Sequence, residues 1–102
     1  MNPSPQGPAT DVVVPPMRLA ASLDLTAAEP LCQALRVRLD DATLAIDGSA
    51  VERISTPCLQ VLAAAHAGAV ARGTAFRLHA PSEALRQAID ELGLSAAIPV
   101  EG

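Results

Sequence analysis

One stretch of the chain, residues 44–73, constrains the fold more than any other, and it reads LAIDGSAVERISTPCLQVLAAAHAGAVARG. It opens with a short apolar run that ends at a turn signal, Asp-Gly-Ser at residues 47–49, which is typical of a buried strand. Ser-Thr-Pro at residues 55–57 then predicts a helix start, because a hydroxyl side chain can cap free backbone N–H groups and proline is tolerated at the first helical position. Gly73 is placed to end that helix, since glycine adopts the left-handed conformation at little cost. We therefore expect a strand, a polar loop over residues 47–57 and a long helix, in that order.

Two strand candidates and a helix precede this stretch. Residues 11–14 and residues 17–23 are apolar enough to form strands, and the two prolines between them favour a hairpin. The helix is expected to begin in a capping box, in which Thr26 is the N-cap and Glu29 reaches back to its backbone N–H. Its apolar face is expected to consist of leucines spaced four apart, namely Leu31, Leu35 and Leu39.

A further strand and helix follow the long helix. Residues 75–79 predict the strand, Ser82 is the expected N-cap of the last helix, and Gly93 is expected to end it. Residues 94–100 are expected to dock as a short final segment. Apolar residues spaced three and four apart predict the buried face of each late helix. These are Leu59, Leu62, Ala63, His66, Ala69 and Val70 in the long helix, and Ala84, Leu85, Ala88, Ile89 and Leu92 in the last one.

This order of elements predicts an α/β fold. Successive strand–helix–strand crossovers make the connected strands parallel. We expect a single domain in which about four strands form a mixed sheet with three or so helices layered on it. Residues 1–10 contain three prolines and are expected to form a flexible tail, which leaves residues 11–102 as the domain.

The composition excludes several classes of function. The chain has a net charge of −4, with seven arginines and no lysine, which argues against a nucleic-acid footprint and against an electrostatic hold on anionic lipid. It has no apolar run of about 18 residues, so we expect no insertion into a membrane, and no signal-peptide pattern stands at residue 1. The two cysteines, Cys32 and Cys58, have no paired spacing and are expected to be reduced thiols in the cytoplasm.

No arrangement of residues predicts catalysis or a cofactor. His66 and His79 have no partner at metal-ligand spacing, and neither belongs to a recognisable catalytic triad. A phosphate-binding glycine loop is absent from the sequence. Cys58, at the helix start, is either a reactive thiol or a small buried apolar side chain. We therefore expect a protein that is not an enzyme and holds no metal or cofactor.

With these elements in place, the chain resembles the STAS domain family, whose best-known members are the anti-sigma factor antagonists. The resemblance covers about residues 17–94 and rests on LDLTAA at residues 23–28, LAIDGSAVERI at residues 44–54 and STPCLQVL from residue 55. In the family the last loop reads Asp, Ser or Thr, a small residue, Gly and Leu, and partner serine kinases phosphorylate the hydroxyl. Thr56 takes the hydroxyl position and Leu59 the leucine, whereas Ser55 replaces the acid and Cys58 the glycine.

The resemblance implies a non-enzymatic protein–protein interaction and switch module in bacterial signal transduction, either anti-sigma factor antagonist-like or chemotaxis-associated. Its partner is expected to be a serine or histidine kinase-like protein or a chemotaxis signalling protein. Thr56 and Ser55 are the phosphorylation candidates, and either hydroxyl can equally be a plain helix cap. The residues expected to bind the partner are Asp47, Ser49, Ser55, Thr56, Pro57, Cys58 and Gln60.

A second interpretation is of another kind. Similar small STAS proteins are accessory subunits of membrane lipid-transport ABC complexes and dock on the cytoplasmic ATPase. In that setting the same loop is a constitutive contact, and phosphorylation plays no part. A small-molecule sensor also stays open. An Ala-rich exposed helix face would further suit a weak homodimer.

Overall fold

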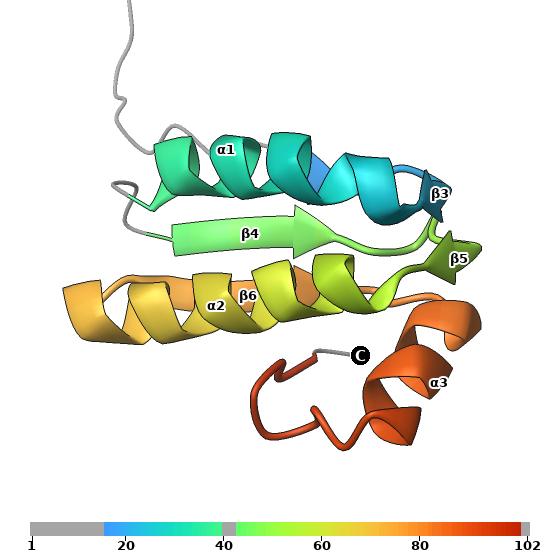
Figure 1. Ribbon diagram of the computed structural model, residues 1–102. Helices are drawn as coiled ribbons and strands as arrows, with labels where there is room; N and C mark the ends of the chain where they lie inside the picture. The colour runs from blue at the N-terminus through green and yellow to red at the C-terminus, as the bar shows by residue number, and fades with distance from the viewer. Residues whose placement is uncertain (1–15, 40–42, 101–102) are drawn as a thin grey trace, which may run out of the picture.

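Helices and parallel strands alternate in the computed structural model, which describes residues 16–39 and 43–100 (Figure 1). The predicted tail and the strand candidate at residues 11–14 lie outside the described residues. The described elements are β2 (Met17–Arg18), β3 (Ser22–Leu23), the 3-10 helix η1 (Leu25–Ala27), α1 (Ala28–Arg38), β4 (Thr43–Asp47), β5 (Arg53–Ile54), α2 (Thr56–Arg72), β6 (Ala75–His79) and α3 (Glu83–Glu91).

Every strand pair within the described residues is parallel, as the crossovers predict. The main sheet has the order β2-β4-β6, and β4 pairs with β6 from Thr43 opposite Ala75 to Asp47 opposite His79. The short strands β3 and β5 form a separate parallel pair. The single strand expected over residues 17–23 is therefore two short strands that join different sheets. An antiparallel partner for it, the other half of the predicted hairpin, falls outside the described residues.

The core lies between the main sheet and the helices α1 and α2, which contact each other and run along the strands (Figure 1). Leu44 and Ile46 of β4 and Leu78 of β6 are fully buried, because alternate residues of a strand point to the same side of a sheet. The leucine face of α1 is confirmed for Leu31 and Leu35, which are buried in the core, whereas Leu39 follows the last helical residue and is half-buried against it. Because aromatic side chains are almost absent, leucine, isoleucine and alanine fill this core.

Three of the five helix ends predicted from the sequence are confirmed, those at Gly73, Ser82 and Gly93. Gly73 ends α2 with a φ of 72°, and Gly93 follows α3 with a φ of 67°. The Ser82 hydroxyl caps α3 by accepting a hydrogen bond from the Leu85 N–H at 3.1 Å. The docked final segment is confirmed as well, since Ile98 is fully buried in the core.

The expected capping box at α1 is wrong. Asp24 is the cap instead, and its carboxylate accepts from the Thr26 N–H at 3.0 Å and from the Thr26 hydroxyl at 2.6 Å. The chain first makes the 3-10 turn η1, and α1 begins only at Ala28. A carboxylate two residues ahead therefore takes the Thr26 hydroxyl, which leaves it no role as a cap of α1.

Two residues expected in the core are exposed, namely Val70 at 65% and Leu92 at 47%. The buried positions of α2 end at Ala69, and the next residue lies about 100° further round the helix, which carries Val70 out of the buried face. His66 is only half-buried, and its ring meets Phe76 edge-on at 5.2 Å between centroids.

Candidate functional site

The loop between β4 and α2 is the candidate site, and Gly48 fixes its first turn. The Gly48 N–H donates to the His79 carbonyl at 3.1 Å, and the Gly48 carbonyl accepts from Val51 at 3.3 Å and Ser82 at 3.0 Å. Both the loop and the connection from β6 to α3 are thereby held at the carboxyl end of the sheet. A Cβ at residue 48 would lie 2.6 Å from the Leu85 Cδ2, so any other residue at this position would displace the Leu85 side chain.

Asp47, the last residue of β4, stabilises this turn with its side chain. Its carboxylate accepts a hydrogen bond from the Ser49 N–H at 2.9 Å. The backbone N–H of Ser49 and then its hydroxyl lower the pKa of Asp47 below its ordinary value, and the charges of Arg18 and His79 add to the effect. Arg18, Asp47 and His79 stand opposite one another on three neighbouring strands. The predicted partner-binding residue Asp47 is therefore a structural residue of the turn.

The second half of the loop is tied to the segment that precedes η1. The N–H groups of Glu52 and Arg53 both donate to the Ala21 carbonyl, at 2.7 and 3.1 Å. The Ser55 N–H donates to the Leu23 carbonyl at 2.8 Å. The short strand β5 was not predicted, because two residues are too few for a periodic pattern. These bonds hold the chain in a defined position up to the first residue of α2.

At the start of α2 the two hydroxyl residues differ sharply. Ser55 is the N-cap residue, with an extended backbone, but its side chain makes no capping bond. Its Oγ is buried and has no hydrogen-bond partner among the described residues. Thr56 is the first helical residue and is exposed, so the expectation that Thr56 caps the helix is wrong. Pro57 is the second helical residue rather than the first.

The predicted partner-binding residues differ in how far their side chains are buried. Ser49, Thr56 and Gln60 are exposed, and Asp47, Ser55 and Pro57 are half-buried. Cys58 is fully buried, and its thiol donates to the Asp24 carbonyl at 3.4 Å, which excludes it from the outer surface. The exposed side chains of the loop and of the first turns of α2 are those of Ser49, Glu52, Arg53, Thr56 and Gln60.

Sequence reasoning missed one residue of this site, Ser82. Besides capping α3, its hydroxyl donates to the Val51 carbonyl at 2.6 Å and so holds the middle of the loop. The only sequence signal was its role as a cap, which gives no hint of a contact 31 residues away. Ala80, two residues earlier, adopts a φ of 47° to turn the chain toward this contact.

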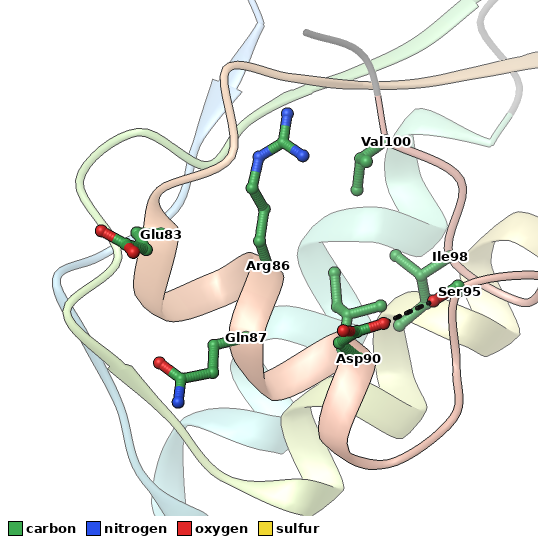
Figure 2. Close-up of a pocket in the computed structure, with 8 residues that line it drawn as sticks. Glu83, Arg86, Gln87, Asp90, Ser95, Ile98 and Val100 are labelled. Carbon is green, nitrogen blue, oxygen red and sulfur yellow. Dashed lines mark hydrogen bonds between the residues drawn. The ribbon is translucent and has the colours of Figure 1, made fainter.

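The arrangement offers binding surface rather than reactive groups. Within residues 16–39 and 43–100, His, Cys, Asp and Glu side chains nowhere gather in a set that could hold a metal ion. A hollow of about 430 Å³ lies between α3 and the final segment (Figure 2). Its charged lining has both signs, with Arg86 beside Glu83 and Asp90, and the Ser95 hydroxyl donates to Asp90 at 3.4 Å. In the described part of the chain, every helix is too short or too polar to cross a membrane.

Comparison with known proteins identifies the family of this domain. A family model described as "Mlab, STAS domain" matches residues 8–99, which is most of the chain. The chain belongs to the STAS domain family. The resemblance found on the loop and helix residues is thus confirmed over a longer range than expected. STAS domains generally mediate protein–protein interactions and are generally not enzymes.

The fold of this STAS domain is also similar to that in the NMR structure of the protein TM1081. The two share a TM-score of 0.69 at 16% sequence identity, and the match covers 82% of this chain and 70% of that one. At this identity the likeness extends to the fold alone. No curated protein matches the chain in sequence.

Proposed function

We propose that this STAS domain is a switch module in bacterial signal transduction, anti-sigma factor antagonist-like or chemotaxis-associated. Its partner would be a serine or histidine kinase-like protein, or a chemotaxis signalling protein, in the cytoplasm. The partner would bind the loop between β4 and α2 and the N-terminal end of α2, where Ser49, Thr56 and Gln60 are exposed. Phosphorylation of Thr56 would regulate that binding.

One observation carries this proposal: an exposed hydroxyl, that of Thr56, stands at the end of a loop whose backbone is fixed by hydrogen bonds on both sides. A phosphate there would add about −1.5 to −2 charges, and the free N–H groups and dipole at a helix start favour an anion. The domain would therefore keep its fold when modified. The partner, in contrast, would face a new dianion in the middle of its contact surface.

Burial separates the two phosphorylation candidates. The Ser55 hydroxyl is buried, so a kinase could reach it only after the start of α2 had opened. Thr56 needs no such opening. This difference in burial supports Thr56, and not Ser55, as the modified residue.

The test is affinity capture from the native cell with the wild type, Thr56→Glu and Ala67→Glu, read by mass spectrometry with mapping of phosphosites. Ala67→Glu is the control, because it adds the same charge to an exposed position of the same helix, away from its start. We expect a signalling protein captured by the wild type and by Ala67→Glu but not by Thr56→Glu, with phosphate on Thr56. Equal capture by all three forms would reject the switch.

A second candidate is the accessory subunit of a membrane lipid-transport ABC complex. The residue before Thr56 favours it, because Ser55 stands where the signalling pattern has an acid, and its buried hydroxyl offers a kinase no charge. A loop fixed by hydrogen bonds also suits a constitutive contact. Capture of a transporter ATPase by the wild type and Thr56→Glu alike, with no phosphate on Thr56, would favour this candidate.

A further inference from the structure

A groove of about 230 Å³ lies between α1 and α2, and no residue of the loop over residues 47–57 lines it. Its walls are mainly apolar, with Leu35 of α1 facing Val61, Ala64 and Ala65 of α2. Cys32 and Arg36 of α1 complete the lining, the first half-buried and the second exposed. We call this feature the α1–α2 groove.

The helix surface beside the α1–α2 groove is unusually poor in charge. In the 17 residues of α2 the only charged side chain is the last one, Arg72. The outward positions Ala64, Ala67 and Ala71 of α2 are exposed at helical spacing. A contiguous apolar surface of this kind on a small domain indicates a binding site for another chain.

The charge around the α1–α2 groove indicates what kind of chain fits. The whole protein has a net charge of −4, but α1 and α2 together contain three arginines, Arg36, Arg38 and Arg72, and one acid, Glu29. Glu29 lies in the first turn of α1, about two helical turns before Arg36. Of these charged residues only Arg36 lines the groove, so its apolar walls lie beside a single cation. The hollow beside α3, in contrast, has charges of both signs and favours neither (Figure 2).

We infer that the α1–α2 groove is a second docking surface, which takes a segment of a protein partner that carries apolar side chains next to a carboxylate. The apolar side chains would lie against Leu35, Val61 and Ala64, and the carboxylate would pair with Arg36. Electrostatic complementarity of this kind selects the partner and its orientation. The lining of the groove shares no residue with the proposed contact around Thr56, so one domain could join two proteins.

The first test uses designed peptides as probes. A fluorescein-labelled helical peptide of Leu, Ala and Glu is compared, by anisotropy, with the same peptide in which every Glu is Gln or Lys. We expect the Glu peptide to bind and to weaken as salt rises, because exposed charge pairs are screened. Bound peptide should also slow the alkylation of Cys32 by N-ethylmaleimide, read by intact mass. Cys58 is fully buried and serves as the unreactive thiol in the same spectrum.

Variants locate the binding. Arg36→Glu should weaken the Glu peptide about tenfold or more, since attraction becomes repulsion. Ala64→Gln should fill the groove and weaken binding, whereas Ala34→Gln makes the same change on an exposed position of α1 outside the lining and should bind like the wild type. Arg53→Glu, on the Thr56 side of the molecule, and Thr56→Glu should leave peptide binding unchanged. The proposed switch can therefore fail while this inference holds, and this inference can fail while the switch holds.

Three outcomes would overturn the inference. The first is equal binding of the Glu, Gln and Lys peptides. The second is an Arg36→Glu variant that binds the Glu peptide as tightly as the wild type does. The Asp40→Asn/Asp41→Asn variant, which removes the two acids that follow α1, is measured in the same experiment. The third is sedimentation showing a dimer that Ala64→Gln dissociates, which would make a second copy of this chain the occupant of the groove.

Discussion

The thiol of Cys58 donates a hydrogen bond to the backbone carbonyl of Asp24, with 3.4 Å between sulfur and oxygen. Asp24 caps the turn that leads into α1, and Cys58 stands in the first turn of α2. The bond thus joins the beginnings of two neighbouring helices from residues 34 positions apart. The STAS pattern has a glycine in place of Cys58, and a glycine could make no such contact.

We predict that Cys58→Ala lowers the free energy of unfolding by about 1–2 kcal/mol, because it removes a fully buried side chain and leaves a small cavity. Urea unfolding followed by circular dichroism measures the difference. Cys32→Ala is the control, since Cys32 is only half-buried and should change stability by less than about 0.5 kcal/mol. Equal effects of the two substitutions would show that the contact with Asp24 adds no stability.

Gly48→Ala should be strongly unfavourable. The new Cβ would lie 2.6 Å from the Leu85 Cδ2 and 3.4 Å from the Pro81 Cα, so the fully buried Leu85 side chain would have to shift within the core. Overpacking of this kind costs about 1–3 kcal/mol. Thermal and urea unfolding measure it.

Gly68→Ala is the matched control for that substitution. Its Cβ would meet the Leu39 Cδ1 at 3.4 Å, a distance that a flexible side-chain end can adjust. Gly68 lies inside α2, where alanine favours the helix over glycine by about 1 kcal/mol. We expect this variant to be as stable as the wild type or more stable. A Gly48→Ala protein of equal stability would contradict the close packing described at the loop.

Asp47 makes stability depend on pH in a defined direction. Hydrogen bonds from Ser49 lower its pKa in the folded state below the ordinary value of 3.8. The unfolded chain therefore binds more protons, and the contribution of Asp47 is fully present above its unfolded pKa and is lost as the pH falls through its lower folded pKa. Asp47→Asn keeps an acceptor for Ser49 but cannot titrate. We expect the variant to lose less unfolding free energy than the wild type between about pH 5 and pH 3.

Asp24 behaves in the same way, with its pKa lowered first by the hydroxyl of Thr26. Asp24→Asn should therefore flatten the same part of the curve, and the double variant should combine both effects. Urea titrations at several pH values test this. A wild-type slope retained in the double variant would mean that other carboxyl groups control the acid range.

The sequence predicted the order of elements and several helix ends because those signals are local. Gly73 and Gly93 end helices because each adopts a positive φ, which glycine does readily, and Ser82 caps a helix through a residue three positions away. The leucines of α1 face the core because their spacing matches the helical repeat. The parallel arrangement followed from the crossovers alone.

What the sequence could not show depends on contacts between distant segments. The loop after β4 is positioned by Ala21, Leu23 and Ser82, none of which lies near it in sequence. The N-cap signal at the start of α2 was wrong by one residue in place and wrong in mechanism. Ser55 takes the cap position, whereas its hydroxyl is buried without a capping bond.

Ser82→Ala tests one of those distant contacts. It removes the cap of α3 and the 2.6 Å hydrogen bond to the Val51 carbonyl, so we expect a loss of about 1–2 kcal/mol in unfolding free energy. Ser95→Ala, which removes an exposed and longer bond to Asp90, is the control and should cost less than about 0.5 kcal/mol. Amide exchange should also become faster at Val51, whose N–H is part of the same loop. Unchanged exchange there would show that Ser82 stabilises α3 alone.

Ser55→Ala distinguishes a capping hydroxyl from a buried unpaired one. Loss of a working N-cap costs about 1 kcal/mol, whereas removal of a buried polar atom without a partner is neutral or stabilising. Since the Ser55 Oγ has no hydrogen-bond partner among the described residues, we expect Ser55→Ala to be at least as stable as the wild type in urea. Thr56→Ala should change stability little as well, because its side chain is exposed. A loss of about 1 kcal/mol in Ser55→Ala would instead assign the capping role to Ser55 and show that its hydroxyl turns toward the helix in solution.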